Sequence, residues 1–292
     1  MVIALVAATT IPDMRINITE DPAARPAPQR TSWLTRLGRL GYAAKGVVYM
    51  VVGFLAIEAA LGRGGETTDT QGAVEAVGDS PLGNIHLIVI AIGLLGYALW
   101  RVLSAATDAE NRGDKPSSIA LRLGEAARGI AYGSLGVFAL RYVMNGDGRQ
   151  GDPAAEWTNR LLGLPAGRWI VIAIGLGILA YAIYQIYRAI SQKFLKHFDL
   201  SSADPGVRKA IERLGGFGIA ARAIVFGMIG VLTLRAGWNY DPSRAGGIEE
   251  SLDALAGGTG RIVFGIIAAG LIAYGILQLA TARYRVMRDP TQ

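Results

Sequence analysis

The sequence predicts an all-α integral membrane protein with six transmembrane helices, formed by three copies of one two-helix hairpin in pseudo-threefold packing. The first indication is composition: 51% of the 292 residues are apolar and the mean hydropathy is +0.34, more than a soluble domain usually carries. The second is six apolar stretches close to the roughly 20 helical residues that cross about 30 Å of hydrocarbon. We expect these spans at residues 42–61, 85–103, 126–144, 169–187, 219–236 and 262–280.

The third indication is an internal repeat. A Gly-x-Ala-Ala-Lys/Arg motif opens each odd-numbered span, at residues 41–45, 124–128 and 218–222. An aromatic residue follows each motif after four positions, and a glycine follows after four more. Each even-numbered span carries a Gly-x-x-x-Tyr motif, which ends at Tyr97, Tyr181 and Tyr274. Because self-similarity of this kind reflects a repeated structural unit, we predict three equivalent hairpins.

We divide the chain into a leader and three repeats. Residues 20–32 are rich in proline and polar residues, and we predict that residues 1–32 form a disordered cytoplasmic leader. Its first ten residues are apolar but lack a basic segment, so they make a poor signal peptide, and we expect the native start at Met14. The repeats are residues 33–110, 117–194 and 206–287, together one membrane domain. Each begins with a short apolar and basic segment that we expect to lie in the membrane interface.

These motifs resemble those of the bacterial membrane family called domain of unknown function 1206. The resemblance covers about residues 34–287 and rests on the opening Gly-x-Ala-Ala-Lys/Arg and the closing Gly-x-x-x-Tyr, which recur three times in register. It implies a six-span membrane protein. It implies no activity, because the family has none established.

The distribution of basic residues predicts the orientation. When successive connections are assigned to alternate sides, 21 of the 29 Lys and Arg residues fall on the side that holds both termini. The positive-inside rule then places both termini in the cytoplasm of a multi-pass protein of the bacterial plasma membrane. A basic cytoplasmic face also explains the net charge of +6 through contact with anionic lipid headgroups, so we expect no nucleic-acid partner.

The composition argues against several kinds of chemistry. The chain has no cysteine and two histidines, so we expect neither disulfides nor a metal site. Nucleotide-binding and nucleophile motifs in a fitting context are absent, and the spans do not supply a converging acid, base and nucleophile. We therefore predict no catalytic residues, no cofactor and no enzymatic activity.

Glycines in the odd-numbered spans recur at helical spacing and form a nearly flat face. Small residues drive helix association in lipid because they let backbones approach closely. We therefore expect helix packing at Gly129, Gly133, Gly136, Gly227, Gly230 and Gly53. We expect the tyrosines of the even-numbered spans to belong to the aromatic belt at the membrane surface.

Each motif cation is separated from the next charged residue of its span by an unusually short stretch of sequence. Twelve uncharged residues follow each of Lys45, Arg128 and Arg222, which is about 20 Å of helix against about 30 Å of hydrocarbon. One interpretation is that the three cations reach the cytoplasmic headgroups and stack on the aromatic residue one turn later. The other is that pseudo-threefold packing gathers them into a ring that binds a lipid phosphate or an anionic solute.

The charges at the far end of these stretches are Glu58, Arg141 and Arg235. A lone carboxylate in a membrane protein is costly, so an ion pair between Glu58 and one of the two arginines is one interpretation. Solvated residues at the interface are the other.

Two functions fit these features. Small-residue faces, interfacial basic segments and span centres with few polar groups favour a non-enzymatic membrane protein that interacts with lipids or with a membrane-protein partner. The repeat symmetry and the charged helix ends favour a channel or transporter for anions or small solutes. Polar groups are scarce at the centres of the spans, which favours the first function.

Overall fold

The structure is a computed structural model, and it describes residues 33–63, 67–109, 113, 115–146, 153–201 and 203–287. The predicted leader and the predicted start at Met14 lie outside these residues. The described residues form helices and connecting turns, with one isolated β-bridge between Phe198 and Arg285. The all-α prediction is confirmed for this part of the chain.

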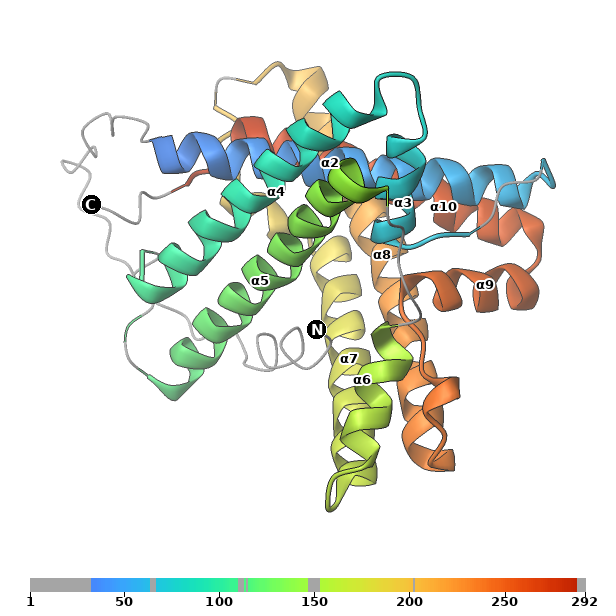
Figure 1. The fold of residues 1–292 in the computed structure, drawn as a ribbon. Coiled ribbons are helices and arrows are strands. Elements are labelled where there is room, and N and C mark those ends of the chain that lie inside the picture. The colour runs from blue at the N-terminus through green and yellow to red at the C-terminus, as the bar shows by residue number, and fades with distance from the viewer. Residues whose placement is uncertain are drawn as a thin grey trace.

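Six long helices form the three repeats (Figure 1). The first helix of each repeat is α2 (Trp33–Ala60), α5 (Pro116–Asn145) or α8 (Pro205–Asn239). The second is α4 (Gly83–Ala106), α7 (Gly167–Ile190) or α10 (Arg261–Tyr284). Each segment that we expected in the membrane interface is continuous with the span that follows it, so the first helices are 28, 30 and 35 residues long.

Five of these helices are long and apolar enough to cross a membrane: α2, α4, α7, α8 and α10. Helix α5 covers the predicted third span but is less apolar than the other five. Its glycines, its serines and its arginines at positions 128 and 141 dilute the apolar residues. Length and composition therefore support five of the six predicted spans.

A short helix lies between the two long helices of each repeat, which the sequence analysis did not predict. These helices are α3 (Thr70–Gly78), α6 (Pro153–Leu162) and α9 (Ile248–Thr259). The side chain of Asp69 caps α3 by accepting hydrogen bonds from the backbone N–H groups of Gln71 and Gly72. Two 3₁₀ turns, η1 (Lys193–His197) and η2 (Pro242–Arg244), complete the described elements.

The turn that leads into the second helix is the same in the first two repeats. Leu82 and Ala166 both have positive φ angles, of 62° and 61°, directly before the glycines that begin α4 and α7. A Cβ atom on Gly83 would lie 1.9 Å from the carbonyl oxygen of Gly78. Only glycine fits this approach, which explains the matching Pro-x-Gly sequences at these two turns.

The closest helix pairs form between repeats rather than within them. Helix α10 packs on α2, α4 packs on α5, and α7 packs on α8, so each second helix lies against the first helix of the next repeat. Figure 1 shows these three pairs running side by side in three different directions. Within repeats, α2 packs on α4 and α8 packs on α10, but the described parts of α5 and α7 are not packed together.

Glycines make these pairs possible. A Cβ atom would lie 2.7–3.0 Å from atoms of the facing helix at five predicted packing positions, which are Gly53, Gly129, Gly133, Gly136 and Gly230. Gly227, the sixth, is different because its nearest contact would be 3.8 Å away. The first glycine of the motif serves the contact within a repeat: a Cβ on Gly41 would lie 2.2 Å from the Cβ of Tyr97, and one on Gly218 would lie 2.3 Å from the backbone nitrogen of Tyr274.

Two glycines of α8 give a matched test of this packing. Gly218→Ala places a methyl group against the α10 backbone, and we expect it to lower the free energy of unfolding by about 1–3 kcal/mol. Gly227→Ala makes only an ordinary van der Waals contact, 3.8 Å from the Cβ of Ala182, so the higher helix propensity of alanine should leave stability equal or higher by up to about 1 kcal/mol. Thermal unfolding in detergent measures both. Equal effects of the two substitutions would contradict this account of the α8–α10 contact.

Candidate functional site

Lys45 lies inside the helix bundle, with 6% of its surface exposed. Its ammonium nitrogen is 4.5 Å from the centre of the Tyr132 ring, 5.7 Å from that of Tyr274 and 6.0 Å from that of Tyr49. The three rings come from α5, α10 and α2, so one residue from each repeat surrounds this cation. The ring faces carry negative potential and attract a cation.

Arg222 is buried in the same region, with 7% of its surface exposed. Its Nε donates a hydrogen bond of 3.2 Å to the hydroxyl of Tyr49. Its guanidinium lies 4.2 Å from the ring centre of Phe226 and 5.0 Å from that of Tyr274. Tyr49 and Tyr274 therefore contact both cations and join them into one cluster.

The two buried cations make equivalent contacts with aromatic residues. Lys45 contacts the aromatic residue one turn later in its own repeat and the equivalent residue of the second repeat, Tyr132. Arg222 contacts the aromatic residue one turn later in its own repeat and the equivalent residue of the first repeat, Tyr49. This cyclic order is what pseudo-threefold packing produces.

Arg128, the cation of the second repeat, differs from the other two in its contacts. It is half-buried, and its Nε donates a hydrogen bond of 3.3 Å to the carbonyl of Gly124 in its own helix. Its charge still acts on Lys45 and on Tyr181, so it stands at the margin of the cluster. The structure thus brings two of the three predicted cations together and places the third beside them. We call Lys45, Arg222, Arg128 and the rings around them the cation cluster.

Lys45 and Arg222 are buried among aromatic rings, which favours the interpretation that helix packing gathers the cations over the one in which they extend outward to the headgroups. The tyrosines at positions 97, 181 and 274 are also buried, at 1%, 8% and 6% exposure. The prediction that they belong to an aromatic belt is therefore wrong. For Tyr97 and Tyr274 the reason is the close crossing at Gly41 and Gly218, which places these residues against the first helix of their repeat.

The cation cluster is positively charged without a counterion among the described residues. No carboxylate there forms an ion pair with Lys45 or Arg222. Desolvation of a buried charge costs several kcal/mol, whereas a desolvated cation–π contact returns about 2 kcal/mol. Arg222 and Arg128 also repel Lys45. Ionisable groups buried inside a membrane protein make this cluster a candidate functional site.

A second buried cluster contains an ion pair. Arg101 of α4 is 3% exposed and forms a 3.3 Å ion pair with Glu125 of α5. It also donates hydrogen bonds to the hydroxyls of Tyr97, at 3.1 Å, and Tyr42, at 2.6 Å. Arg285 donates to Tyr42 at 2.8 Å from the other side. This cluster ties the ends of α2, α4, α5 and α10 together.

The sequence analysis missed this second cluster, although two signals were present. Tyr42 and Glu125 occupy the variable second position of the repeated motif, and Arg101 follows Tyr97 by one helical turn. A polar residue at a variable position is ordinarily solvated, so only the packing of α4 on α5 reveals the pair.

The predicted outer ion pair does not form. Glu58 is half-buried, Arg141 and Arg235 are exposed, and no salt bridge among the described residues joins Glu58 to either arginine. The exposed guanidinium groups have no need of a protein counterion. This outcome matches the alternative interpretation, in which these charges are solvated.

The three repeats match a known protein family. The sequence pattern of the family described as Domain of Unknown Function (DUF1206) matches residues 40–108, 123–192 and 217–285. The chain belongs to this family. A relative from Bacillus subtilis (strain 168), named "Uncharacterized protein YxxB", is 34% identical over 256 residues, which is 87% of this chain and 92% of the relative. No solved structure matches.

The three matches of the DUF1206 family agree with the helices. Each match begins before or at the repeated motif and ends near the end of the second long helix. The motif cations and the buried tyrosines all fall within the matched residues. The cation cluster is therefore built from the repeated unit itself and not from an insertion.

The buried ion pair should be more costly to break than an exposed one. Glu125→Gln leaves Arg101 buried without its counterion, and we expect a loss of about 3–5 kcal/mol in unfolding free energy. Glu156→Gln breaks the pair with Arg160, whose side chains are 61% and 62% exposed, and should cost less than about 1 kcal/mol. Chemical or thermal unfolding in detergent compares the two. A Glu125 effect as small as the Glu156 effect would contradict the assignment.

We expect the opposite effect on stability when the charge of Lys45 is removed. Methionine has a similar length, keeps contact with the aromatic rings and removes a desolvated, repelled charge. We expect Lys45→Met to raise the free energy of unfolding by about 1 kcal/mol or more. Lys209→Met, at an exposed lysine of α8, should change it by less than about 0.5 kcal/mol. A strong destabilisation by Lys45→Met would mean that the cation serves the fold and not a ligand.

Proposed function

We propose that this protein is a non-enzymatic, multi-pass protein of the bacterial plasma membrane that binds an anionic lipid at the cation cluster. In this proposal α5 also crosses the membrane, which brings the number of spans to six, and both termini are cytoplasmic. The observation that carries the proposal is the burial of Lys45 and Arg222 without an ion-paired carboxylate in the described part of the chain. A phosphate group supplies the missing negative charge.

The gap in the helix packing supports a lipid as the source of that phosphate. The described parts of α5 and α7 are not packed together, whereas the equivalent helices pack on each other in the other two repeats, α2 on α4 and α8 on α10. Arg128 lies on α5, where it is half-buried and donates a hydrogen bond to the carbonyl of Gly124 in its own helix. Both helices expose large apolar side chains, among them Ile130 and Val137 on α5 and Leu176 and Ile183 on α7. A phosphate near Arg128 with acyl chains along these helices satisfies both features.

Lipid retention tests the proposal. The protein is purified from membranes that contain phosphatidylglycerol and phosphatidylcholine, and native mass spectrometry counts the lipids that remain bound. We expect selective retention of phosphatidylglycerol. Because a charge-assisted hydrogen bond contributes about 1.5–3 kcal/mol, Arg128→Gln should weaken retention about tenfold or more.

Arg141→Gln is the matched control, because it removes an exposed arginine from the same helix. It should leave phosphatidylglycerol retention unchanged. Equal retention of both lipids by every variant would reject the proposal. A selective anion flux in proteoliposomes that Arg128→Gln abolishes would replace it with the channel alternative.

A further inference from the structure

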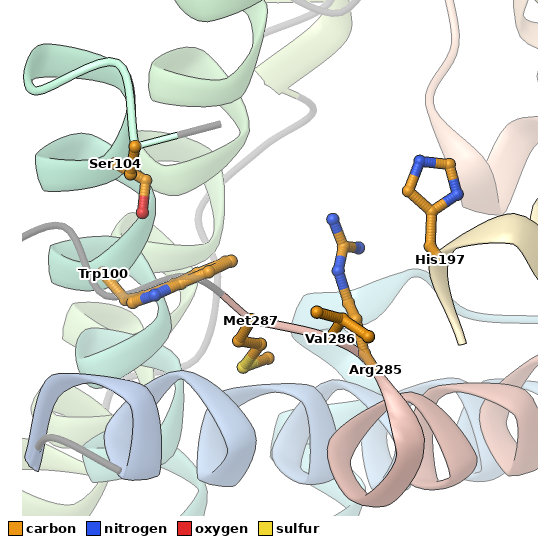
Figure 2. Close-up of a pocket in the computed structure, with 7 residues that line it drawn as sticks. Trp100, Ser104, His197, Arg285, Val286 and Met287 are labelled. Atoms are coloured by element: carbon orange, nitrogen blue, oxygen red, sulfur yellow. The ribbon is translucent and has the colours of Figure 1, made fainter. Parts of the chain in front are cut away.

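One face of α7 is uncovered, although the equivalent face is buried in the second helix of each of the other two repeats. On α7, Ala180 and Tyr184 are exposed and Gly177 and Arg188 are half-buried. These positions are three or four residues apart, so they share one side of the helix. Their equivalents are all buried: Gly93, Gly96, Trp100 and Ser104 in α4, and Gly270, Ala273, Leu277 and Thr281 in α10. Figure 2 shows Trp100 and Ser104 on the same side of α4.

The first helix of the repeat covers this face in the first and third repeats. A Cβ atom on Gly38 of α2 would lie 3.0 Å from the Trp100 ring, and one on Gly215 of α8 would lie 2.9 Å from the Leu277 side chain. Helix α5 does not pack on α7 in this way. Tyr184 is therefore 40% exposed, whereas Trp100 and Leu277 are 2% and 4% exposed.

The uncovered face becomes polar and basic toward the end of α7. Arg188 lies in the last turn of this helix, at the position that is a serine in α4 and a threonine in α10. Its Nη1 donates a hydrogen bond of 3.0 Å to the side-chain oxygen of Gln185, which uses one of the five N–H donors of a guanidinium. No salt bridge among the described residues involves Arg188 or Arg128. Both side chains thus have donors for a ligand.

Arg188 extends the positive charge of the cation cluster onto α7. The charges of Arg222, Arg128 and Arg188 all act on the hydroxyl of Tyr181, which is buried in α7. Arginine stays protonated in proteins, so these three side chains carry three permanent positive charges. A headgroup with a single negative charge neutralises only one of them. Basic pockets between membrane helices on the cytoplasmic side are typical sites for lipids with highly charged headgroups.

We infer that Arg188 and Tyr184 complete the lipid site on the α7 side, and that the bound lipid carries two negative charges in its headgroup. This inference rests on the proposed function. Arg128 and Arg188 bind the phosphate oxygens from the two walls of the gap, and the Tyr184 hydroxyl donates a further hydrogen bond. The small side chains at Gly177 and Ala180 leave room for an acyl chain along α7. The two charges belong either to one phosphomonoester or to two phosphodiesters.

Competition between lipids tests this inference. The full-length protein in detergent is mixed with equal amounts of phosphatidylcholine, phosphatidylglycerol, phosphatidic acid and cardiolipin, and native mass spectrometry counts the lipids that remain bound. These lipids carry no net charge, one phosphodiester, one phosphomonoester and two phosphodiesters. We expect phosphatidic acid or cardiolipin to be retained about tenfold more than phosphatidylglycerol, since a second charge gains a charge-assisted hydrogen bond.

Arg188→Gln should abolish this preference, while phosphatidylglycerol is still retained over phosphatidylcholine because the cation cluster remains. Arg283→Gln is the matched control, since Arg283 is an exposed arginine in the last turn of α10. It should leave the preference unchanged.

A second pair of variants tests the location without changing the charge. Ala180→Leu fills the uncovered face of α7 and should weaken retention of the preferred lipid about tenfold. Ala173→Leu enlarges an alanine on a face that is exposed in all three repeats, as Val89 and Ile266 show, and should leave retention unchanged. Neither substitution should lower the melting temperature without lipid, because both alanines are exposed.

The outcomes separate this inference from the proposed function. Equal retention of all four lipids rejects both. Selective retention of phosphatidylglycerol without a preference for a doubly charged lipid overturns this inference alone, and so does a preference that survives Arg188→Gln or falls equally with Arg283→Gln. A preference for phosphatidic acid that depends on Arg188 supports a phosphomonoester, and one for cardiolipin supports two phosphodiesters.

Discussion

The close approach of helix backbones at glycine is the constraint on which the rest of this structure depends. In the motif, Gly41 and Gly218 bring the second helix of their own repeat against the first. The glycines farther along, such as Gly53 and Gly230, bring in the second helix of the preceding repeat. Because both contacts lie within a few turns of the motif cation, the cation is enclosed rather than left at the surface. Helix packing and charge burial are therefore consequences of one sequence motif.

Much of the architecture could be predicted from the sequence, because its signals are periodic. Apolar length locates the long helices, and the repeat locates the equivalent glycines and cations. The gap between α5 and α7 could not be predicted, since the second repeat carries the same motifs as the other two. The loop helices were missed because their segments, of 9, 10 and 12 residues, are much shorter than a membrane span.

The candidate site was predicted in part. Lys45 and Arg222 were singled out by the short charge-free stretch after them, but that spacing fits an exposed anchor as well as a buried cation. Burial is decided by how α4 and α10 pack on α2 and how α7 and α10 pack on α8, which is a matter of three-dimensional packing. The Arg101–Glu125 pair was missed for the same reason. Its two members are separated by a loop and belong to different repeats.

The departure from threefold symmetry follows from electrostatics. A closed ring of three equivalent hairpins would bury all three motif cations together, and two unit charges about 6 Å apart repel by roughly 3 kcal/mol at an effective dielectric constant of about 20. In the structure Arg128 is half-buried, and its repeat is the one whose long helices are not packed together. The missing contact between α5 and α7 keeps Arg128 from full burial beside the other two cations. An anion bound as proposed above offsets the same repulsion between the cations.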